Sequence, residues 1–298
     1  MARTLGILAL AVLCSGASCG KKSSANPDEY DDISNTFDDS EPKPDDRKPV
    51  DGVDLSKLDP TQKQRFERLV DRLISPCGKA HSLRTSKNND PDCKRAPFAV
   101  EYVVMLLADG FSNAEIREIY NLRYKQDSAR GFKLDGAPHS GPDDARVVLV
   151  EFYDYGCPAC AEFKLTLEEA GGAFPQDAVV YYKMFPLAAH EHSPGAAQAA
   201  LAAHAQGKFK QMHDLLFKNQ FKHQKDDLWA HARAIGLDMN RFETDFKTAE
   251  AVVNADKAEG TEAGVSGTPT LYVNGRKYDG ILHPKYLKMW IEEELALE

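Results

Sequence analysis

The chain has 298 residues, of which 42% are hydrophobic and 28% are charged, the balance of a soluble globular protein with one large domain or two ordinary ones. Its formal net charge is −9, and the sequence contains no basic stripe to offset it, which argues against a nucleic-acid partner. The charge itself does not select a substrate.

Residues 1–19 predict an export signal. Arg3 precedes an apolar stretch and then small residues, the layout of a bacterial secretory signal. The apolar stretch, from Leu5 to Leu13, is shorter than the roughly 20 residues of a membrane-spanning helix. The letters GASC, ending at Cys19, resemble a lipoprotein processing box, which implies that Cys19 receives a lipid and becomes the first residue. Simple cleavage after Ala17, the alternative, would leave Cys19 as an unpaired thiol.

The cysteine count fits an oxidising compartment. If Cys14 is cleaved away and Cys19 carries a lipid, four cysteines remain, an even set. These four are Cys77, Cys93, Cys157 and Cys160. We therefore expect a protein of the cell envelope, on the periplasmic side of a Gram-negative bacterium, that contacts the membrane only through an N-terminal lipid.

Residues 20–50 are rich in acids, prolines and small polar residues and bury too little apolar surface to fold, so they are interpreted as a flexible tether. A small helical domain is expected over residues 51–128. Its first helix lies within TQKQRFERLVDRLI, where apolar residues from Phe66 to Ile74 recur on one face. A second helix is predicted over Ala96–Ala108, and a capping box formed by Ser112 and Glu115 opens a third.

Cys77 and Cys93 bracket the loop between the first two of these helices. In an exported protein the favoured interpretation is a structural disulfide, and the alternative is a second redox pair that exchanges with Cys157 and Cys160. The segment LLADGFSNAEIREIYNLRY resembles the helical part of the cytochrome c maturation thiol protein CcmH, whose two thiols form a close pair. In this chain the two cysteines lie far apart.

Residues 129–298 predict a mixed α/β sheet with a block of helices inserted at about 187–264. Phe132–Leu134 is a candidate edge strand, and the segment from His139 to Asp144 is interpreted as a turn. RVVLVEFYDY is typical of a buried central strand, and a helix then follows Cys157. The remaining elements are a strand in AVVYYKMF, the Ala-rich helices, a hairpin turning at Asn274-Gly275, and a last helix over Pro284–Ala296.

The sequence Cys157-Pro158-Ala159-Cys160 predicts a redox-active pair. At the start of a helix, backbone N–H groups and the helix dipole stabilise a thiolate on Cys157. Pro158 suits the first helical turn, where its missing N–H costs nothing. The thiolate can attack a partner's disulfide, and Cys160 can resolve the mixed disulfide that forms.

A zinc site would need more ligands than this one close pair supplies, and a disulfide across so short a loop would constrain the unfolded chain little. We therefore predict no metal and no cofactor. Glu151, inside an apolar run, is either a buried carboxylate that accepts the proton of Cys160 or a solvent-facing strand residue. Pro269, in SGTPT, either initiates a strand in an ordinary way or follows a cis peptide bond.

Three segments together, EFYDYGCPAC, FPLAAHEHSPGAAQAALAAHAQGKFKQMHDLLF and GVSGTPTLYVNGR, resemble DsbA-type thiol–disulfide oxidoreductases of the thioredoxin superfamily. The resemblance covers about residues 133–298 and implies a thioredoxin-like fold. It implies that Cys157 is the nucleophile, Cys160 the resolving thiol and Glu151 the buried acid. It also implies that Thr268 precedes a cis Pro269, where the backbone pairs with a substrate peptide.

The strongest oxidants of that family carry Pro-His between the cysteines, whereas this chain carries Pro158-Ala159, which indicates a milder oxidant. Thr268 before the proline is more typical of isomerases and reductants. An oxidase of cysteine-containing exported proteins, served by a membrane redox partner, is the favoured hypothesis. The alternatives are a reductant or isomerase, in cytochrome c maturation for example, and a non-catalytic thioredoxin-fold binding lipoprotein. His190 and His192 are interpreted as solvated polar residues.

Overall fold

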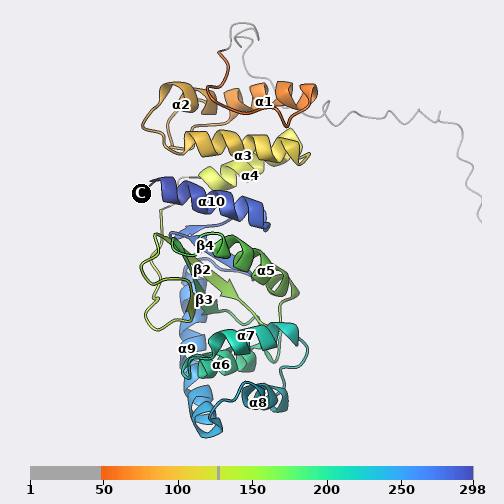
Figure 1. Ribbon diagram of the computed structural model, residues 1–298, viewed down its shortest axis with the longest axis vertical. Coiled ribbons are helices and arrows are strands. Elements are labelled where there is room, and N and C mark those ends of the chain that lie inside the picture. The colour runs from red at the N-terminus through yellow and green to blue at the C-terminus, as the bar shows by residue number, and fades with distance from the viewer. Residues whose placement is uncertain (1–47, 126–127, 298) are drawn as a thin grey trace, which may run out of the picture. The chain divides into compact units, whose positions relative to one another are not determined.

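The computed structural model of the chain describes residues 48–125 and 128–297 (Figure 1). The predicted signal sequence, the lipidation of Cys19 and the tether up to residue 47 lie outside the described residues. Lys48 onward is one compact unit. Within its described residues, no helix is long and apolar enough to cross a bilayer.

Four helices open the described chain, one more than the sequence predicted. They are α1 (Pro60–Arg72), α2 (Leu83–Asn89), α3 (Ala96–Ala108) and α4 (Asn113–Tyr124). Helix α4 begins with the predicted capping box, in which the Ser112 and Glu115 side chains each accept a hydrogen bond from the other residue's backbone N–H. Helix α2 was missed because its sequence, LRTSKNN, is polar and short, although Ser82 caps its start.

The first helix ends earlier than its apolar period suggested. Phe66, Leu69 and Val70 are buried as expected. The backbone turns extended at Leu73, so Ile74 leaves the helical face and is 62% exposed. The prediction that Ile74 belongs to the buried face is therefore wrong.

A five-stranded sheet forms the centre of the second half of the chain. Its strands are β1 (His139–Ser140), β2 (Val147–Tyr153), β3 (Ala178–Met184), β4 (Thr270–Val273) and β5 (Arg276–Lys277), in the spatial order β1-β3-β2-β4-β5. Strand β2 pairs in parallel with β3 and antiparallel with β4. Positive φ angles at Asn274 and Gly275 form the predicted tight turn between β4 and β5.

The edge strand differs from the prediction. Phe132–Leu134 forms no strand, and His139–Ser140, expected to be a turn, pairs with β3 instead. The Phe132 ring lies against Phe152 and Tyr272, with ring centroids 5.5 and 4.8 Å apart. The apolar character of this segment therefore serves packing on the sheet rather than pairing at its edge.

Six more helices belong to this half of the chain (Figure 1). They are α5 (Pro158–Gly172), α6 (Ser193–His204), α7 (Phe209–Lys218), α8 (Lys225–Ala234), α9 (Met239–Glu262) and α10 (Pro284–Leu297). Helices α6 to α9 form the inserted block between β3 and β4, as predicted. The fold class predicted from the sequence, a mixed α/β sheet with inserted helices, is confirmed.

Side chains along β2 point alternately to the two faces of the sheet, and this alternation decides which of them face α5. Leu149 and Tyr153 share one core with Cys160 of α5, whereas Val150 and Phe152 belong to a separate core on the other face. Glu151 lies between Leu149 and Tyr153 in this alternation. Its carboxylate therefore faces the side of the sheet that α5 covers.

Candidate functional site

Cys157 and Cys160 occupy the first turn of α5, where the sequence placed them. Cys157 is the N-cap, with extended backbone angles, and Pro158 is the first helical residue. Both thiols are free; Cys157 is 7% exposed and Cys160 is fully buried. Cys157 is therefore the more exposed of the two residues, which is the order that a nucleophile and a resolving thiol would need.

The loop before β4 lies directly against the first thiol. The peptide bond between Thr268 and Pro269 is cis, and the Cys157 thiol donates a hydrogen bond to the Thr268 carbonyl at 3.4 Å. The two segments are 111 residues apart in the chain. The fold thus brings together the residues to which the resemblance assigned catalysis and substrate binding.

Glu151 carries a buried carboxyl group. It is 2% exposed, and its Oε1 atom has no hydrogen-bond partner among the described residues. Burial, reinforced by the negative charge of Glu168, raises the pKa of Glu151 to about 8, and Lys164 opposes part of this increase. Burial and the nearby Glu151 carboxylate also raise the pKa of the Cys160 thiol well above its ordinary value. The charge of Glu151 is thus electrostatically coupled to the Cys160 thiol.

Asp154 holds the turn between β2 and α5, a role the sequence did not reveal. Its buried carboxylate accepts hydrogen bonds from the backbone N–H groups of Gly156, at 2.7 Å, and Leu187, at 2.8 Å. The same carboxylate lies 2.7 Å from Nδ1 of His190. His190, interpreted from sequence as a solvated residue, is therefore part of the support of the active-site turn.

Two more side chains fix the backbone around Cys157. The Ser193 Oγ atom accepts a second hydrogen bond from the Gly156 N–H at 3.0 Å. A side chain at Gly156 would collide with this Oγ, because an added Cβ would lie 2.5 Å from it. The Gln220 side-chain amide donates to the carbonyls of Tyr155 and Cys157, at 3.1 and 2.9 Å.

A buried aromatic chain continues inward from this turn. The Tyr153 hydroxyl donates to the Tyr155 hydroxyl at 2.8 Å, which lies 3.0 Å from Nδ1 of His213 on α7. Burial lowers the pKa of His213 to about 3, so the imidazole is neutral. The ring contacts among these three side chains are thus joined by a hydrogen-bonded network.

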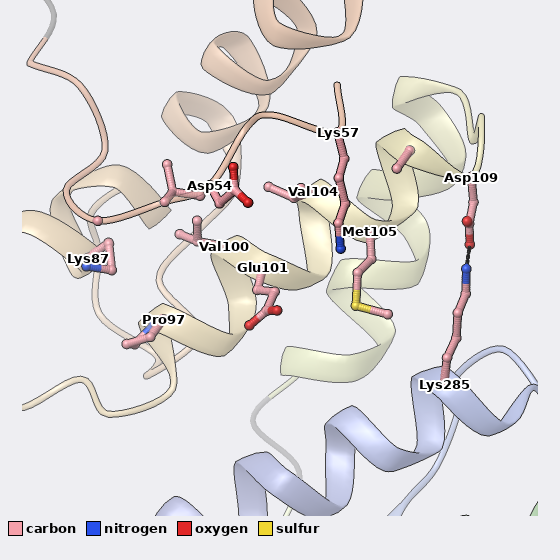
Figure 2. Close-up of a pocket in the computed structure, with 13 residues that line it drawn as sticks. Asp54, Lys57, Lys87, Pro97, Val100, Glu101, Val104, Met105, Asp109 and Lys285 are labelled. Atoms are coloured by element: carbon pink, nitrogen blue, oxygen red, sulfur yellow. Dashed lines mark hydrogen bonds and ion pairs between the residues drawn. The ribbon is translucent and has the colours of Figure 1, made fainter. Parts of the chain in front are cut away.

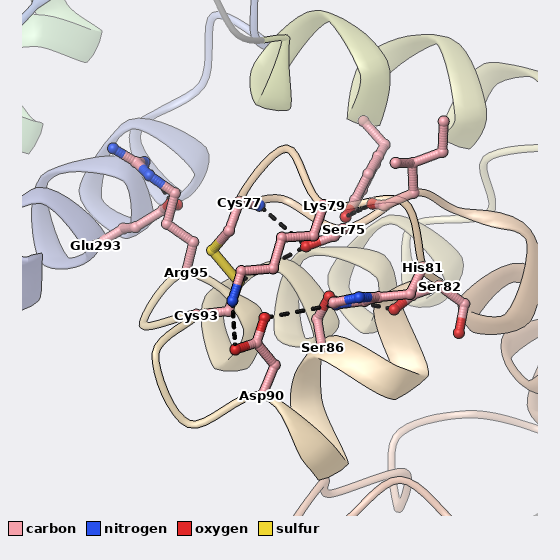
Figure 3. The surroundings of a disulfide bond; sticks show 12 residues. Ser75, Cys77, Lys79, His81, Ser82, Ser86, Asp90, Cys93, Arg95 and Glu293 are labelled. Atoms are coloured by element: carbon pink, nitrogen blue, oxygen red, sulfur yellow. Dashed lines mark hydrogen bonds and ion pairs between the residues drawn. A yellow bond between two sulfur atoms is a disulfide. The ribbon is translucent and has the colours of Figure 1, made fainter.

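Cys77 and Cys93 form a disulfide, with their Cα atoms 5.7 Å apart (Figure 3). Cys93 is 3% exposed. Arg95, two residues further on, donates to Glu293 of α10 at 2.7 Å. In Figure 3 this arginine extends from the disulfide loop toward the last helix.

One hollow of the described residues is separate from the cysteine pair. It has a volume of about 530 Å³ and lies along α3, where Val100, Val104 and Met105 line it and Lys57 and Lys285 stand at its rim (Figure 2). None of its lining residues belongs to α5 or to the loop that carries Pro269. Among residues 48–125 and 128–297, no cluster of three or more potential ligands could hold a metal ion.

The fold and the cysteine pair define a thioredoxin-type protein. The profile of the thioredoxin family matches residues 133–293, and the chain belongs to this family. The superfamily and the thioredoxin-like fold predicted from the sequence are thereby confirmed. The resemblance of the helical segment to CcmH stays a prediction.

Three known proteins illustrate the similarity. A thioredoxin-like oxidoreductase from Silicibacter pomeroyi DSS-3 is 28% identical with a TM-score of 0.50, covering 55% of this chain and 94% of that one. The thiol-disulfide exchange protein α-DsbA2 from Wolbachia pipientis is 19% identical with a TM-score of 0.49, and the match covers 60% of this chain and 94% of that one. The Na(+)/H(+) antiporter NhaA 1 of Mycobacterium sp. (strain KMS) is 37% identical over 145 residues, which are 47% of this chain and 24% of the antiporter. The chain thus matches about a quarter of the length of such curated relatives.

Proposed function

We propose that this protein is a thiol–disulfide oxidoreductase that exchanges the Cys157–Cys160 pair with cysteines of other proteins. The observation that carries the proposal is the position of Cys157, which is 7% exposed at the start of α5 and whose thiol lies against the carbonyl that precedes cis Pro269. The similarity to a thioredoxin-like oxidoreductase supports the same chemistry.

The oxidising half-reaction begins with the pair as a disulfide. A substrate thiolate attacks the Cys157 sulfur, the Cys157–Cys160 bond breaks, and Cys160 leaves with the electron pair and takes a proton from neutral Glu151. A second substrate thiolate then attacks the substrate's sulfur in the mixed disulfide and expels Cys157 as a thiolate. The substrate is oxidised to a disulfide and the enzyme gains two electrons. Run in reverse, the same steps reduce a partner, with ionised Glu151 as the base.

Oxidation of exported proteins is the direction we favour, in the envelope compartment that the signal-like N-terminus and the Cys77–Cys93 disulfide support. A membrane-bound acceptor would return the pair to its disulfide form. Ala159 gives the Cys157 thiolate no cationic neighbour within the motif, so we expect a reduction potential below the roughly −120 mV of the strongest oxidants and above the roughly −270 mV of thioredoxin.

The test combines this potential with two assays, insulin reduction and oxidative refolding of a reduced substrate. We expect refolding activity, and we expect Cys157→Ser to lower both activities to the background rate. Cys160→Ser is the matched variant, because it keeps the nucleophile and should accumulate a mixed disulfide. Either activity surviving in Cys157→Ser would contradict the proposal.

A further inference from the structure

The loop that leads from β3 into α6 reaches the active-site turn at three points. The Leu187 N–H and the His190 imidazole both contact the Asp154 carboxylate. The Ser193 Oγ atom accepts a hydrogen bond from the Gly156 N–H. Two backbone hydrogen bonds brace the loop itself, from the His190 N–H to the Leu187 carbonyl and from the Ser193 N–H to the His190 carbonyl, both at 3.0 Å. His190 thus lies at the centre of a short braced segment that faces the active-site turn.

The Asp154 carboxylate depends on this loop for its hydrogen bonds. Its side chain is 0% exposed, and burial of a carboxylate is costly unless donors compensate its charge. The N–H groups of Gly156 and Leu187 provide two bonds, at 2.7 and 2.8 Å. His190 provides a third at 2.7 Å, and among the described residues it is the one side chain that bonds this carboxylate. Because an ionised carboxylate only accepts, Nδ1 of His190 is the donor.

Asp154 is joined by its backbone to both cysteines. Its carbonyl accepts a hydrogen bond from the Cys157 N–H at 3.1 Å. Burial raises the pKa of the Cys160 thiol, and a hydrogen bond from the Asp154 backbone opposes part of that increase. A displacement of Asp154 would therefore be felt by the nucleophile and by the resolving thiol together.

His190 also covers the turn by direct contact. A Cβ atom added to Gly156 would lie 2.9 Å from both Cβ and Cγ of His190. Because consecutive Cα atoms are ~3.8 Å apart, Cγ of this imidazole lies within about 8 Å of the Cys157 Cα atom. Between the cysteines, Pro158 and Ala159 carry no side-chain donor. The side-chain donors that hold this turn therefore come from distant segments, and His190 is the one that bonds a charged group.

The charge of the Asp154 carboxylate bears on the nucleophile. A negative charge near the start of α5 disfavours a second negative charge on the Cys157 sulfur. A histidine donor offsets the carboxylate, since its bond is charge-assisted and its ring can itself carry a positive charge. Loss of His190 would leave the Cys157 thiolate beside a less compensated carboxylate. The reduced form would then be less stable, and a disulfide whose reduced form is less stable is a weaker oxidant.

We propose that His190 is a positioning residue of the exchange reaction, which holds the Asp154 carboxylate through Nδ1 and thereby stabilises the reduced form of the Cys157–Cys160 pair. The proposal rests on the proposed exchange function and adds what tunes it. A side chain from the loop before α6, outside the C-P-A-C motif, determines how strongly the pair oxidises its partners.

The test measures the equilibrium in which the Cys157–Cys160 disulfide is reduced and two glutathione molecules are oxidised to one glutathione disulfide. His190→Ala removes the donor, and His190→Leu removes it while keeping a bulky side chain over Gly156. We expect each to lower the equilibrium constant about 10-fold, which corresponds to ~30 mV in reduction potential. The rate of Cys157 alkylation by iodoacetamide at constant pH, which follows the thiolate fraction, should fall in both variants.

His190→Asn is the rescue variant. The asparagine amide nitrogen is two bonds from Cβ, as Nδ1 of histidine is, so it can donate to Asp154 from the same place. Its equilibrium constant should stay within about 3-fold of the wild type. His192→Ala is the matched control, because His192 is exposed and lies two residues further along the same loop, and it should keep the wild-type constant. Urea denaturation identifies which variants are folded, and either donor-free variant suffices for the comparison.

A wild-type constant in a folded donor-free variant, or an equal loss in His190→Asn, would overturn the positioning role while leaving the exchange function standing. Failure of the wild type to exchange with glutathione at all would instead overturn the exchange function.

Discussion

At the residue scale, Glu151 has the largest consequence for the chemistry. Its carboxyl group lies on the α5 side of β2, where Lys164 lowers its pKa only in part because the Lys164 ammonium group is itself paired with Glu168 and Asp214. A carboxyl group in this buried environment stays protonated near neutral pH and can donate a proton, and its ionised form can accept one. In the proposed mechanism such a group serves both directions of disulfide exchange.

We predict that Glu151 makes stability depend on pH. The unfolded chain ionises this residue near pH 4.5, whereas the folded protein keeps it neutral up to about pH 8. The unfolded state therefore binds fewer protons across that window, so the free energy of unfolding falls as pH rises through it. The loss is on the order of 5 kcal/mol, since the shift from 4.5 to about 8 amounts to about 1.4 kcal/mol for each pKa unit.

Urea unfolding from pH 4 to pH 9 provides the measurement. The wild type should lose stability relative to Glu151→Gln across this range, and the exposed Glu250→Gln variant should follow the wild type. A stability difference between wild type and Glu151→Gln that stays constant with pH would show that Glu151 is ionised in the folded protein.

The principal site residues could be predicted because their signals are local. The spacing of Cys157 and Cys160, and an acid inside an apolar strand, are visible in one short stretch. Asp154, His190 and Gln220 could not be assigned in the same way, because their hydrogen bonds join segments tens of residues apart. The one available signal was the acid directly before the turn, since Asp favours turns that its side chain can cap.

At the element scale, α9 approaches the sheet closely through a glycine. A Cβ atom at Gly260 would lie 2.8 Å from the rings of both Phe152 and Phe185. Because these rings belong to the core on that face of the sheet, they have little room to move. The absence of a side chain at Gly260 therefore sets the distance between α9 and the sheet.

Gly260→Ala should destabilise the protein by about 1 to 3 kcal/mol, the typical cost of overpacking a core. Gly172→Ala is the matched control in α5, where an added Cβ meets nothing within 4 Å, and it should be neutral or stabilising by up to about 1 kcal/mol. The midpoints of urea denaturation at constant pH measure both effects. Equal midpoints for the two variants would mean that α9 can move away without cost.

Elements with long apolar runs or clear caps could be predicted, such as β2, α3 and α4. Helix α2 and strand β1 could not, because seven polar residues and two strand residues carry almost no periodicity. The segment Phe132–Leu134, which is apolar at both ends, gave a false signal, since burial against Phe152 and pairing in a sheet favour the same residue types.

At the scale of the whole molecule, a buried ion cluster joins the N-terminal helices to the last helix. Glu293 of α10 is fully buried; it accepts hydrogen bonds from Arg95, at 2.7 Å, and from Arg123 of α4. The Tyr124 hydroxyl adds a third donor at 3.2 Å. Helix α10 in turn packs on α5 within the core that contains Cys160.

Glu293→Ala should destabilise the protein by about 3 to 5 kcal/mol, because Arg123, 2% exposed, would be left as an uncompensated buried charge. Lys247→Ala is the control: it breaks the exposed pair with Glu243 and should cost less than about 1 kcal/mol. Thermal denaturation compares the two. A small loss in Glu293→Ala would indicate that water reaches Arg123.

The burial of Cys93 has a consequence for the protein as a population of identical copies. Every copy would carry an attacking thiolate and, in Cys77–Cys93, a disulfide of its own that a neighbour could attack. Exchange requires access to a sulfur atom; Cys93 offers almost none, whereas Cys77 is partly exposed, so a neighbour's thiolate could attack only at Cys77. That attack would expel Cys93 as a thiolate in a buried position, where charge is disfavoured, so the burial of one sulfur opposes scrambling of the bridge between copies.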